Sequence, residues 1–159
     1  MKLFRTDLIT GFTDRLFEIP VDSLDKSDLV FSSGIIRCLC SSESFPNGFK
    51  IKGTVTVPYL FECDRCLDMN SDERKIPFTV WVTEDTKLID KVNLDTLFFP
   101  NTADEIDLME TIYDLIHIEI PVKYLCSNSC RGICVRCGVN LNHQSCECLE
   151  QSENTVLEA

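Results

Sequence analysis

Alternating hydrophobic and polar positions mark two strands in the middle of the chain. Hydrophobic side chains, with Gly53 in the same register, recur at every second position in residues 51–59 and again in residues 78–82. A period of two is typical of a strand with one buried face. Residues 68–72 are polar and predict a turn between the two segments. The pattern therefore predicts an antiparallel hairpin that carries Cys63 and Cys66 near its tip.

A helical spacing of hydrophobic side chains follows in residues 106–120. It predicts one amphipathic helix, with its apolar face packed on the sheet. Thr102 and Glu105 fit a capping box at the start of this helix, and Pro121 ends it. A stripe of this kind is typical of a core face, so we interpret His117, which lies within it, as structural.

The flanking segments have weaker patterns. Residues 1–49 predict irregular strands and loops, in which Cys38 and Cys40 alternate like small, half-buried strand residues. Residues 83–104 predict an acidic connection. Together the patterns predict an α+β fold, in which an antiparallel and partly barrel-like β-sheet carries one packed helix.

Composition limits the class of protein. The chain has 159 residues, of which 44% are hydrophobic, enough for the core of one domain with a small appendage. No segment approaches the ~20 apolar residues that a membrane span needs. Charged residues interrupt the first seven positions, so we expect neither a secretory signal nor a membrane partner, and we expect a cytoplasmic protein.

Ten cysteines are the most unusual feature of the composition. A reducing cytosol disfavours disulfides, so metal binding is the better interpretation. Residues 126–148 contain six cysteines and few large hydrophobic side chains. Zinc replaces hydrophobic burial as the source of folding free energy in such segments. The sequence therefore predicts a zinc knuckle at the C-terminal end of the fold.

The spacing divides eight cysteines into two groups of four. The first is self-contained and consists of Cys134, Cys137, Cys146 and Cys148. A pair separated by two residues directs both sulfurs to one ion, and the second pair returns from a short loop. His143 is an alternative ligand in place of one of these cysteines.

The second predicted group joins Cys63 and Cys66 of the hairpin to Cys126 and Cys130. The alternative is that Cys63 and Cys66 form an isolated pair, either redox-active or free of metal. A thioredoxin-like pair opens a helix, whereas residues 67–70 read as a turn. Closed four-sulfur sites leave no position for water, so we expect two structural zinc ions.

Other chemistry has no support in the residues. The sequence lacks a phosphate-binding glycine loop, a His-Glu-x-x-His motif and a nucleophile elbow, and it has only two histidines. We therefore expect no catalytic residues, no small-molecule substrate and no enzyme.

The net charge of −11 argues against a protein that coats nucleic acid. The charge is −9 in residues 67–119 but +2 in residues 120–148.

These observations predict three parts. Residues 1–124 form the α+β domain with the Cys63/Cys66 hairpin, residues 125–148 form the zinc-knuckle segment, and residues 149–159 form a disordered tail.

Two cysteine motifs resemble those of the YceD family, the large ribosomal RNA subunit accumulation proteins of bacteria and plastids. Residues 61–67 are similar to its Cys-x-Arg-Cys-Leu motif. Residues 130–142 resemble its Cys-x-Gly-Leu-Cys-Pro-x-Cys-Gly-x-Asn-Leu-Asn motif, which a Cys-x-Cys follows. Val135 stands where the family often has proline, which changes the stiffness of a turn and no ligand.

The resemblance implies a non-enzymatic factor in large-subunit ribosome biogenesis that supports accumulation of large-subunit ribosomal RNA. The partner of such a factor would be precursor RNA or a basic ribosomal protein. Arg131, Arg136 and Lys123 would contact the RNA, and the acidic middle of the chain would contact the protein. One alternative is a thiol–disulfide oxidoreductase that uses Cys63 and Cys66. Another, a zinc-ribbon DNA-binding factor, is disfavoured because the predicted helix is acidic.

Overall fold

The computed structural model describes residues 1–24, 29–85 and 96–148. The chain forms two compact units. The sheet unit comprises Met1–Tyr59 and Glu73–Ile120, and the cysteine unit comprises Leu60–Asp72 and Pro121–Ala159. The hairpin tip thus groups with the cysteine-rich segment. The division into three parts stays a prediction, and its tail lies outside the described residues.

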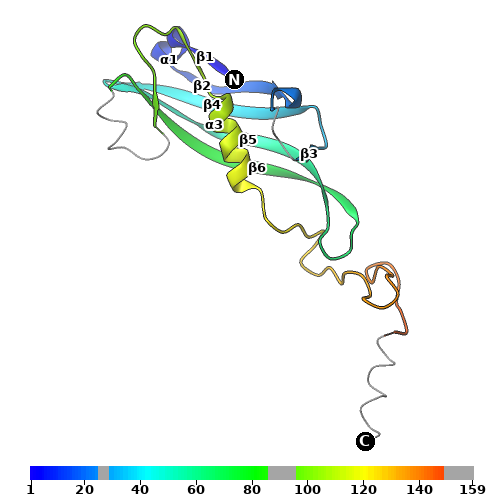
Figure 1. Cartoon of the computed structure of the whole chain (residues 1–159). Helices are drawn as coiled ribbons and strands as arrows, with labels where there is room; N and C mark the ends of the chain where they lie inside the picture. The colour runs from blue at the N-terminus through cyan, green and yellow to red at the C-terminus, as the bar shows by residue number, and fades with distance from the viewer. Residues whose placement is uncertain (25–28, 86–95, 149–159) are drawn as a thin grey trace, which may run out of the picture. The chain divides into compact units, whose positions relative to one another are not determined.

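A six-stranded sheet forms most of the sheet unit (Figure 1). Its strands are β2 (Phe12–Pro20), β3 (Val30–Phe31), β4 (Ile35–Phe45), β5 (Gly48–Glu62), β6 (Met69–Thr83) and β7 (Thr96–Phe98). Their order is β2-β4-β5-β6-β7, with β3 beside β5. β2, β4 and β5 pair antiparallel, whereas β7 pairs parallel with β6. The long β5–β6 hairpin is the one that the alternation predicts.

The described strands make an open sheet. β2 and β7 stand at the two ends of the strand order, and within the described residues neither pairs with the other. The partial closure into a barrel that the sequence predicts is therefore not seen. The coarser prediction is confirmed, because the chain folds into a mostly antiparallel sheet with one main helix.

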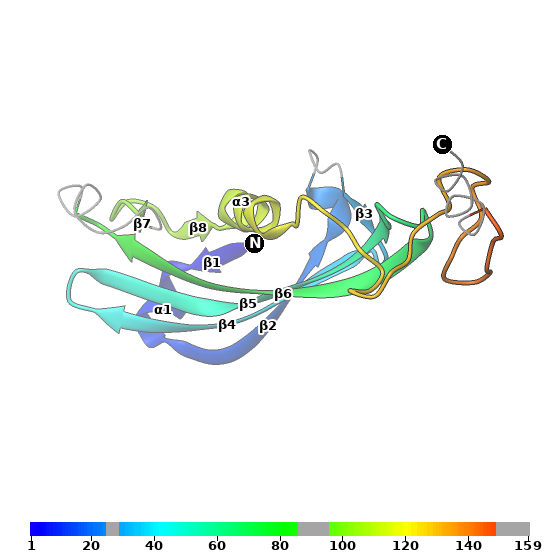
Figure 2. The same ribbon diagram turned by 90° about the horizontal axis from the view of Figure 1, so that it is seen from below.

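The main helix, α3 (Met109–Glu119), lies across one face of the sheet (Figures 1 and 2). Its predicted stripe is confirmed, since Ile112 and Ile116 are buried in the core. His117 is exposed, and its Nδ1 lies 2.9 Å from the Tyr113 carbonyl oxygen. No helix of the described residues is long and apolar enough to cross a membrane.

The predicted start of the helix is wrong. Residues 105–107 form strand β8 (Glu105–Asp107), which pairs antiparallel with β1 (Lys2–Phe4), so Thr102 and Glu105 make no capping box. Asp107 instead accepts a hydrogen bond from the Met109 N–H, 3.0 Å away, at the start of α3. Pairing with a strand from the other end of the chain outweighs the local helical pattern.

Other elements also differ from the prediction. The first residues include helix α1 (Arg5–Thr10) and the short 3-10 helix η1 (Val21–Ser23). The predicted turn at 68–72 is largely strand, because β6 begins at Met69 and the cysteines themselves form the turn. The acidic connection contains strand β7, and residues 86–95 of that connection lie outside the described part.

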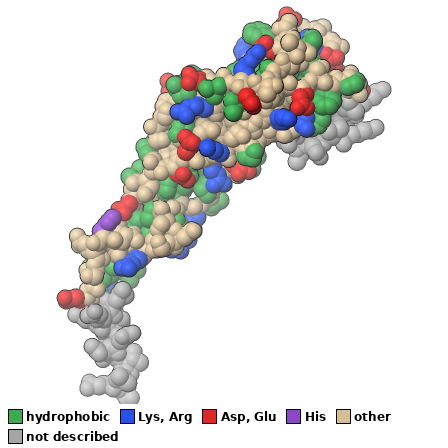
Figure 3. Space-filling model, turned by 180° about the vertical axis from the view of Figure 1, so that it is seen from behind, with side chains coloured by type: hydrophobic (Ala, Val, Ile, Leu, Met, Phe, Trp, Pro, Cys, Tyr) green, Lys and Arg blue, Asp and Glu red, His purple; other side chains and the backbone are tan. Residues whose placement is uncertain are grey.

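Buried side chains of the sheet and α3 form one core. Alternate residues of β4 point into it, including Cys38 and Cys40, which are 0% and 1% exposed. They are more deeply buried than the half-buried strand residues that the sequence predicts. On the face opposite α3, basic, acidic and hydrophobic side chains are intermixed (Figure 3).

Candidate metal centre

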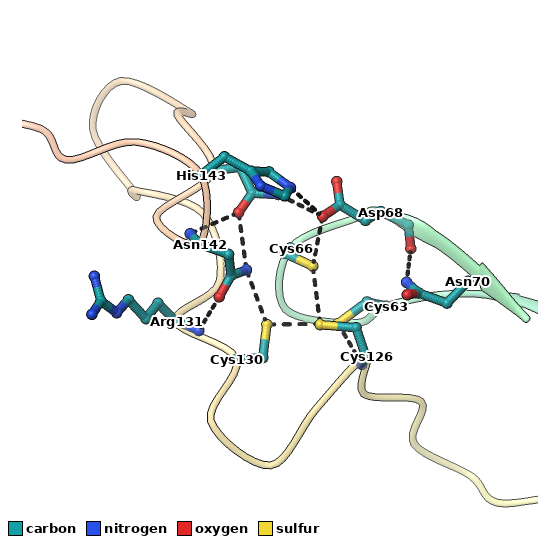
Figure 4. A network of polar contacts seen from close by, with 10 residues as sticks. Cys63, Cys66, Asp68, Asn70, Cys126, Cys130, Arg131, Asn142 and His143 are labelled. Carbon is teal, nitrogen blue, oxygen red and sulfur yellow. Dashed lines mark hydrogen bonds and ion pairs between the residues drawn. The ribbon is translucent and has the colours of Figure 1, made fainter. Parts of the chain in front are cut away.

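Four cysteines of the cysteine unit meet in one cluster, which we call the shared site. Cys63 and Cys66 come from the turn between β5 and β6, and Cys126 and Cys130 come from the segment after α3. All four sulfurs lie within 4.8 Å of one another. The Cys63 and Cys130 sulfurs are 3.8 Å apart, and those of Cys66 and Cys126 are 3.6 Å apart (Figure 4). Tetrahedral zinc with ~2.3 Å bonds places its sulfurs about 3.8 Å apart, so these residues fit the ion.

A second cluster, which we call the C-terminal site, lies within one short segment. Its members are Cys134, Cys137, Cys146 and Cys148, whose sulfurs also lie within 4.8 Å of one another. The segment closes on itself through an antiparallel bridge between Ile133 and Asn140. A set of four thiols without a water position suits a structural ion.

Both clusters begin with the same backbone turn. In each, the residue four positions after the first cysteine donates its N–H to the carbonyl of that cysteine, at 2.9 Å from Leu67 to Cys63 and 2.8 Å from Gly138 to Cys134. The N–H of each first cysteine in turn donates to the carbonyl five residues ahead, at 3.0 and 2.8 Å. Leu67 and Gly138 share a positive φ, 62° and 73°. The chain thus builds two copies of one knuckle, and the first uses leucine where glycine is usual.

This turn favours the thiolate of the leading cysteine. Burial raises the pKa of Cys63, but the N–H groups of Cys126, Arg65 and Cys66 have the larger effect. They lower the pKa to about 6. In the second knuckle the N–H groups of Cys137 and Arg136 lower the pKa of Cys134 to about 6. A thiolate at neutral pH is the form that binds metal.

Each cluster also contains thiols whose pKa is raised. An N–H of Asp68 lowers the pKa of Cys66, but burial and the neighbouring thiols together raise it to about 12. The thiol of Cys137 and burial raise the pKa of Cys148 to about 11. Four thiols this close cannot all ionise without a counter-charge. We therefore expect metal binding to release protons from both clusters.

Arg65 and Gly132 hold the first knuckle against the C-terminal segment. The Arg65 guanidinium donates to the Cys130 carbonyl at 3.1 Å, and the Arg65 carbonyl accepts from the Ile133 N–H at 2.9 Å. A Cβ on Gly132 would lie 2.9 Å from that same carbonyl, and Gly132 has a φ of 76°. Only glycine fits this position without a shift of the backbone.

The structure brings together each of the two sets of four sulfurs that the sequence predicts, and the assignment of ions to them stays a proposal. His143 lies outside both sets, with Nε2 3.1 Å from the Asp68 Oδ2 atom. Cys38 and Cys40 lie in the core of the sheet unit and belong to neither cluster.

The family model described as "Large ribosomal RNA subunit accumulation protein YceD" matches residues 50–159, which include all eight clustered cysteines. The chain belongs to the YceD family. The matched region begins inside β5, so most of the segment before the hairpin lies outside the family model. No solved structure matches the chain.

Named relatives share shorter stretches. The Large ribosomal RNA subunit accumulation protein YCED homolog 1, chloroplastic, of Arabidopsis thaliana is 44% identical over 54 residues, 34% of this chain and 17% of the relative. Its Zea mays counterpart is 46% identical over 55 residues, 34% of this chain and 19% of the relative. An uncharacterised protein of Mycobacterium tuberculosis is 29% identical over 99 residues, 62% of this chain and 48% of the relative. The matches thus span less than a fifth of the plant relatives and about half of the mycobacterial one.

Sequence reasoning missed the polar residues around the sulfurs. Asp68 and Asn142 lie next to the shared site (Figure 4), where Asn142 donates to the Cys130 sulfur. Asn140 donates to Asp68. The two asparagines belong to the Asn-Leu-Asn end of the family-like motif, which carries no metal-ligand chemistry. The spacing of the two asparagines was the signal that could have revealed them. Two amide side chains separated by one residue, between two pairs of metal ligands, suggest a loop of fixed conformation.

Proposed function

We propose that this chain is a non-enzymatic, zinc-binding factor that supports accumulation of large-subunit ribosomal RNA. The observation that carries the proposal is the pair of four-thiol clusters, each with its sulfurs within 4.8 Å of one another, in a member of the YceD family. Zinc in both clusters would fix the fold of the cysteine unit, which has few buried hydrophobic side chains of its own. The plant relatives' names supply the link to ribosomal RNA.

We propose that the partner is precursor large-subunit RNA or a ribosomal protein. Lys123, Arg131 and Arg136 are exposed on the cysteine unit, where they suit contacts with phosphate groups. The Arg136 guanidinium also donates to the Cys148 carbonyl, 3.3 Å away, so the C-terminal site positions this side chain. The acidic residues 67–119 suit a basic protein.

Capture of the tagged chain from cell lysate tests this proposal. We expect large-subunit ribosomal RNA or ribosomal proteins above the background of an untagged lysate, with precursor RNA enriched over small-subunit RNA. The double variant Arg131→Ala and Arg136→Ala should recover less RNA, whereas Arg37→Ala and Lys52→Ala, on the sheet unit, should not. If nuclease treatment leaves the ribosomal proteins bound, the chain acts through protein. Recovery of neither partner would refute the proposal.

The redox alternative is decided by the metal itself. The purified chain should carry about two zinc ions, and its clustered thiols should react with a thiol reagent only after chelation. Cys63 and Cys66 are 0% and 3% exposed, which hinders attack on a substrate disulfide. A readily oxidised Cys63–Cys66 pair in zinc-loaded protein would favour the oxidoreductase instead.

A further inference from the structure

The loop that closes the C-terminal site also contacts the shared site. Residues 140–143 lie between the two cysteine pairs of the C-terminal site. From this loop the Asn142 side-chain amide donates to the Cys130 sulfur at 3.4 Å (Figure 4). The Asn140 amide donates to the Asp68 Oδ2 atom at 2.8 Å. One loop thus supplies hydrogen bonds to both halves of the shared site, the hairpin and the segment after α3.

Asp68 connects this loop to a ligand of the shared site. Its Oδ2 atom lies 3.1 Å from the His143 Nε2 atom, and its backbone carbonyl accepts from the Cys63 N–H at 3.0 Å. Asp68 thus joins the loop, through its side chain, to the first knuckle, through its backbone. Groups that orient metal ligands in this way change metal affinity strongly when they are removed.

Hydrogen bonds within the loop fix the orientation of both amides. The Asn142 side-chain oxygen accepts from the Arg131 N–H at 2.8 Å. The Asn140 side-chain oxygen accepts from the Asn142 N–H and from its amide, both at 2.9 Å. Such a network orients its amides only while the loop backbone is held in place. Cys137 and Cys146 flank the loop on its two sides, so an ion in the C-terminal site would hold it.

We propose that the two sites load with metal cooperatively, because loop 140–143 belongs to one site and orients the ligands of the other. This inference rests on the proposed function only in that both clusters bind metal. The C-terminal site fills first, since its ligands lie within residues 134–148 and close a shorter loop than those of residues 63–130. Its ion fixes the loop, and the loop then presents Asn142 to Cys130 and Asn140 to Asp68.

Thermodynamic linkage makes this coupling reciprocal. If the C-terminal ion raises the metal affinity of the shared site by some factor, the ion in the shared site must raise the affinity of the C-terminal site by the same factor. Loss of a group that orients metal ligands typically costs 10–100-fold in metal affinity. We therefore expect the two sites to be coupled by about 10-fold.

Competition of the full chain with a zinc chelator measures the coupling. The shared-site affinity is compared between wild type and the double variant Cys134→Ser and Cys137→Ser, which lacks the C-terminal site. The C-terminal affinity is compared between wild type and Cys63→Ser with Cys66→Ser, which lacks the shared site. We expect both affinities to fall by the same factor, about 10-fold. Unchanged affinity of either site would overturn the coupling, and wild type without zinc would overturn the proposed function as well.

Variants outside the ligand set show which residues carry the coupling. Asn140→Ala with Asn142→Ala should keep two zinc ions but bring the coupling factor close to one. Asp68→Ala tests the same link from the hairpin side, where it leaves the C-terminal segment unchanged. Glu62→Ala, which removes the same charge from the same hairpin, is the matched control and should keep the coupling. If Asp68→Ala and Glu62→Ala behave alike, the link through Asp68 is wrong.

Discussion

At the scale of single residues, Gly53 shows how closely two strands of the sheet approach. It pairs with Cys40 across the β4–β5 ladder. A Cβ on Gly53 would lie 2.4 Å from the Leu39 carbonyl oxygen and 2.5 Å from the Cys40 Cβ. Both neighbours belong to a strand that cannot move without breaking its ladder. The pairing of these strands therefore requires glycine at this position.

Gly53→Ala should accordingly destabilise the sheet unit by about 2 kcal/mol, the usual cost of overpacking. Urea unfolding of the zinc-saturated chain measures this cost. Gly34→Ala is the matched control, because a Cβ there would meet no atom within 4 Å. Equal midpoints for the two variants would show that β4 and β5 do not approach this closely.

The cysteine groups were predictable because thiols carry strong chemistry and recur at fixed spacing. The pairing of Cys63 with Cys130 followed from each group needing four ligands, and the two sulfurs are 3.8 Å apart. The bonds of Asp68 were not predictable, since its partner Asn140 lies 72 residues away. An aspartate in a turn is equally typical of a solvated surface.

At the scale of elements, Arg5 ties the start of α1 to the segment before β8. Its guanidinium donates to the carbonyls of Pro100 and Ala103, at 2.7 and 2.9 Å, and forms an ion pair with Glu84. It also lies 3.9 Å above the Phe99 ring, which is buried in the core. A flat group with several donors satisfies all these contacts at once.

Arg5→Lys should therefore destabilise the sheet unit nearly as much as Arg5→Ala. An ammonium group keeps the charge but leaves at least one carbonyl without its donor, at a cost of about 1–3 kcal/mol. The measurement is the free energy of unfolding in urea. Arg37→Lys, at an exposed position of β4, should leave that free energy unchanged. Arg5→Lys with wild-type stability would mean that the charge alone matters.

The elements that the sequence predicted correctly are those with a local pattern. The β5–β6 hairpin has a strict alternation and a short connection, and α3 has a hydrophobic stripe. The misplaced elements depend on distant partners. β8 pairs with β1, whose residue Leu3 lies opposite Ile106, so the helical pattern around residue 105 was overridden. β7 has only three residues and pairs in parallel with β6, which leaves no period to detect.

At the scale of the whole molecule, the shared site joins two segments that are far apart in the chain. Cys66 and Cys126 are separated by 60 positions. An ion that binds both would restrict the unfolded chain much as a disulfide does, by roughly 2–4 kcal/mol. The C-terminal site closes a much shorter loop, so the entropic stabilisation from its ion is smaller. The two ions thus differ in what their loss does to the molecule.

Substitutions in the two halves of the shared site should therefore be equivalent. Cys63→Ser, Cys130→Ser and the variant with both changes should each lose one of two zinc ions in excess metal, with nearly the same loss of stability. The reason is that either change removes the same ion, so the second change finds nothing left to remove. Metal content by mass spectrometry of the native protein and urea unfolding give the two readouts. Cys38→Ser is the control for a buried thiol outside both clusters, and it should lose stability but no zinc. Additive losses in the double variant would mean that the hairpin and the segment after α3 hold separate ions, in spite of the 3.8 Å between their sulfurs.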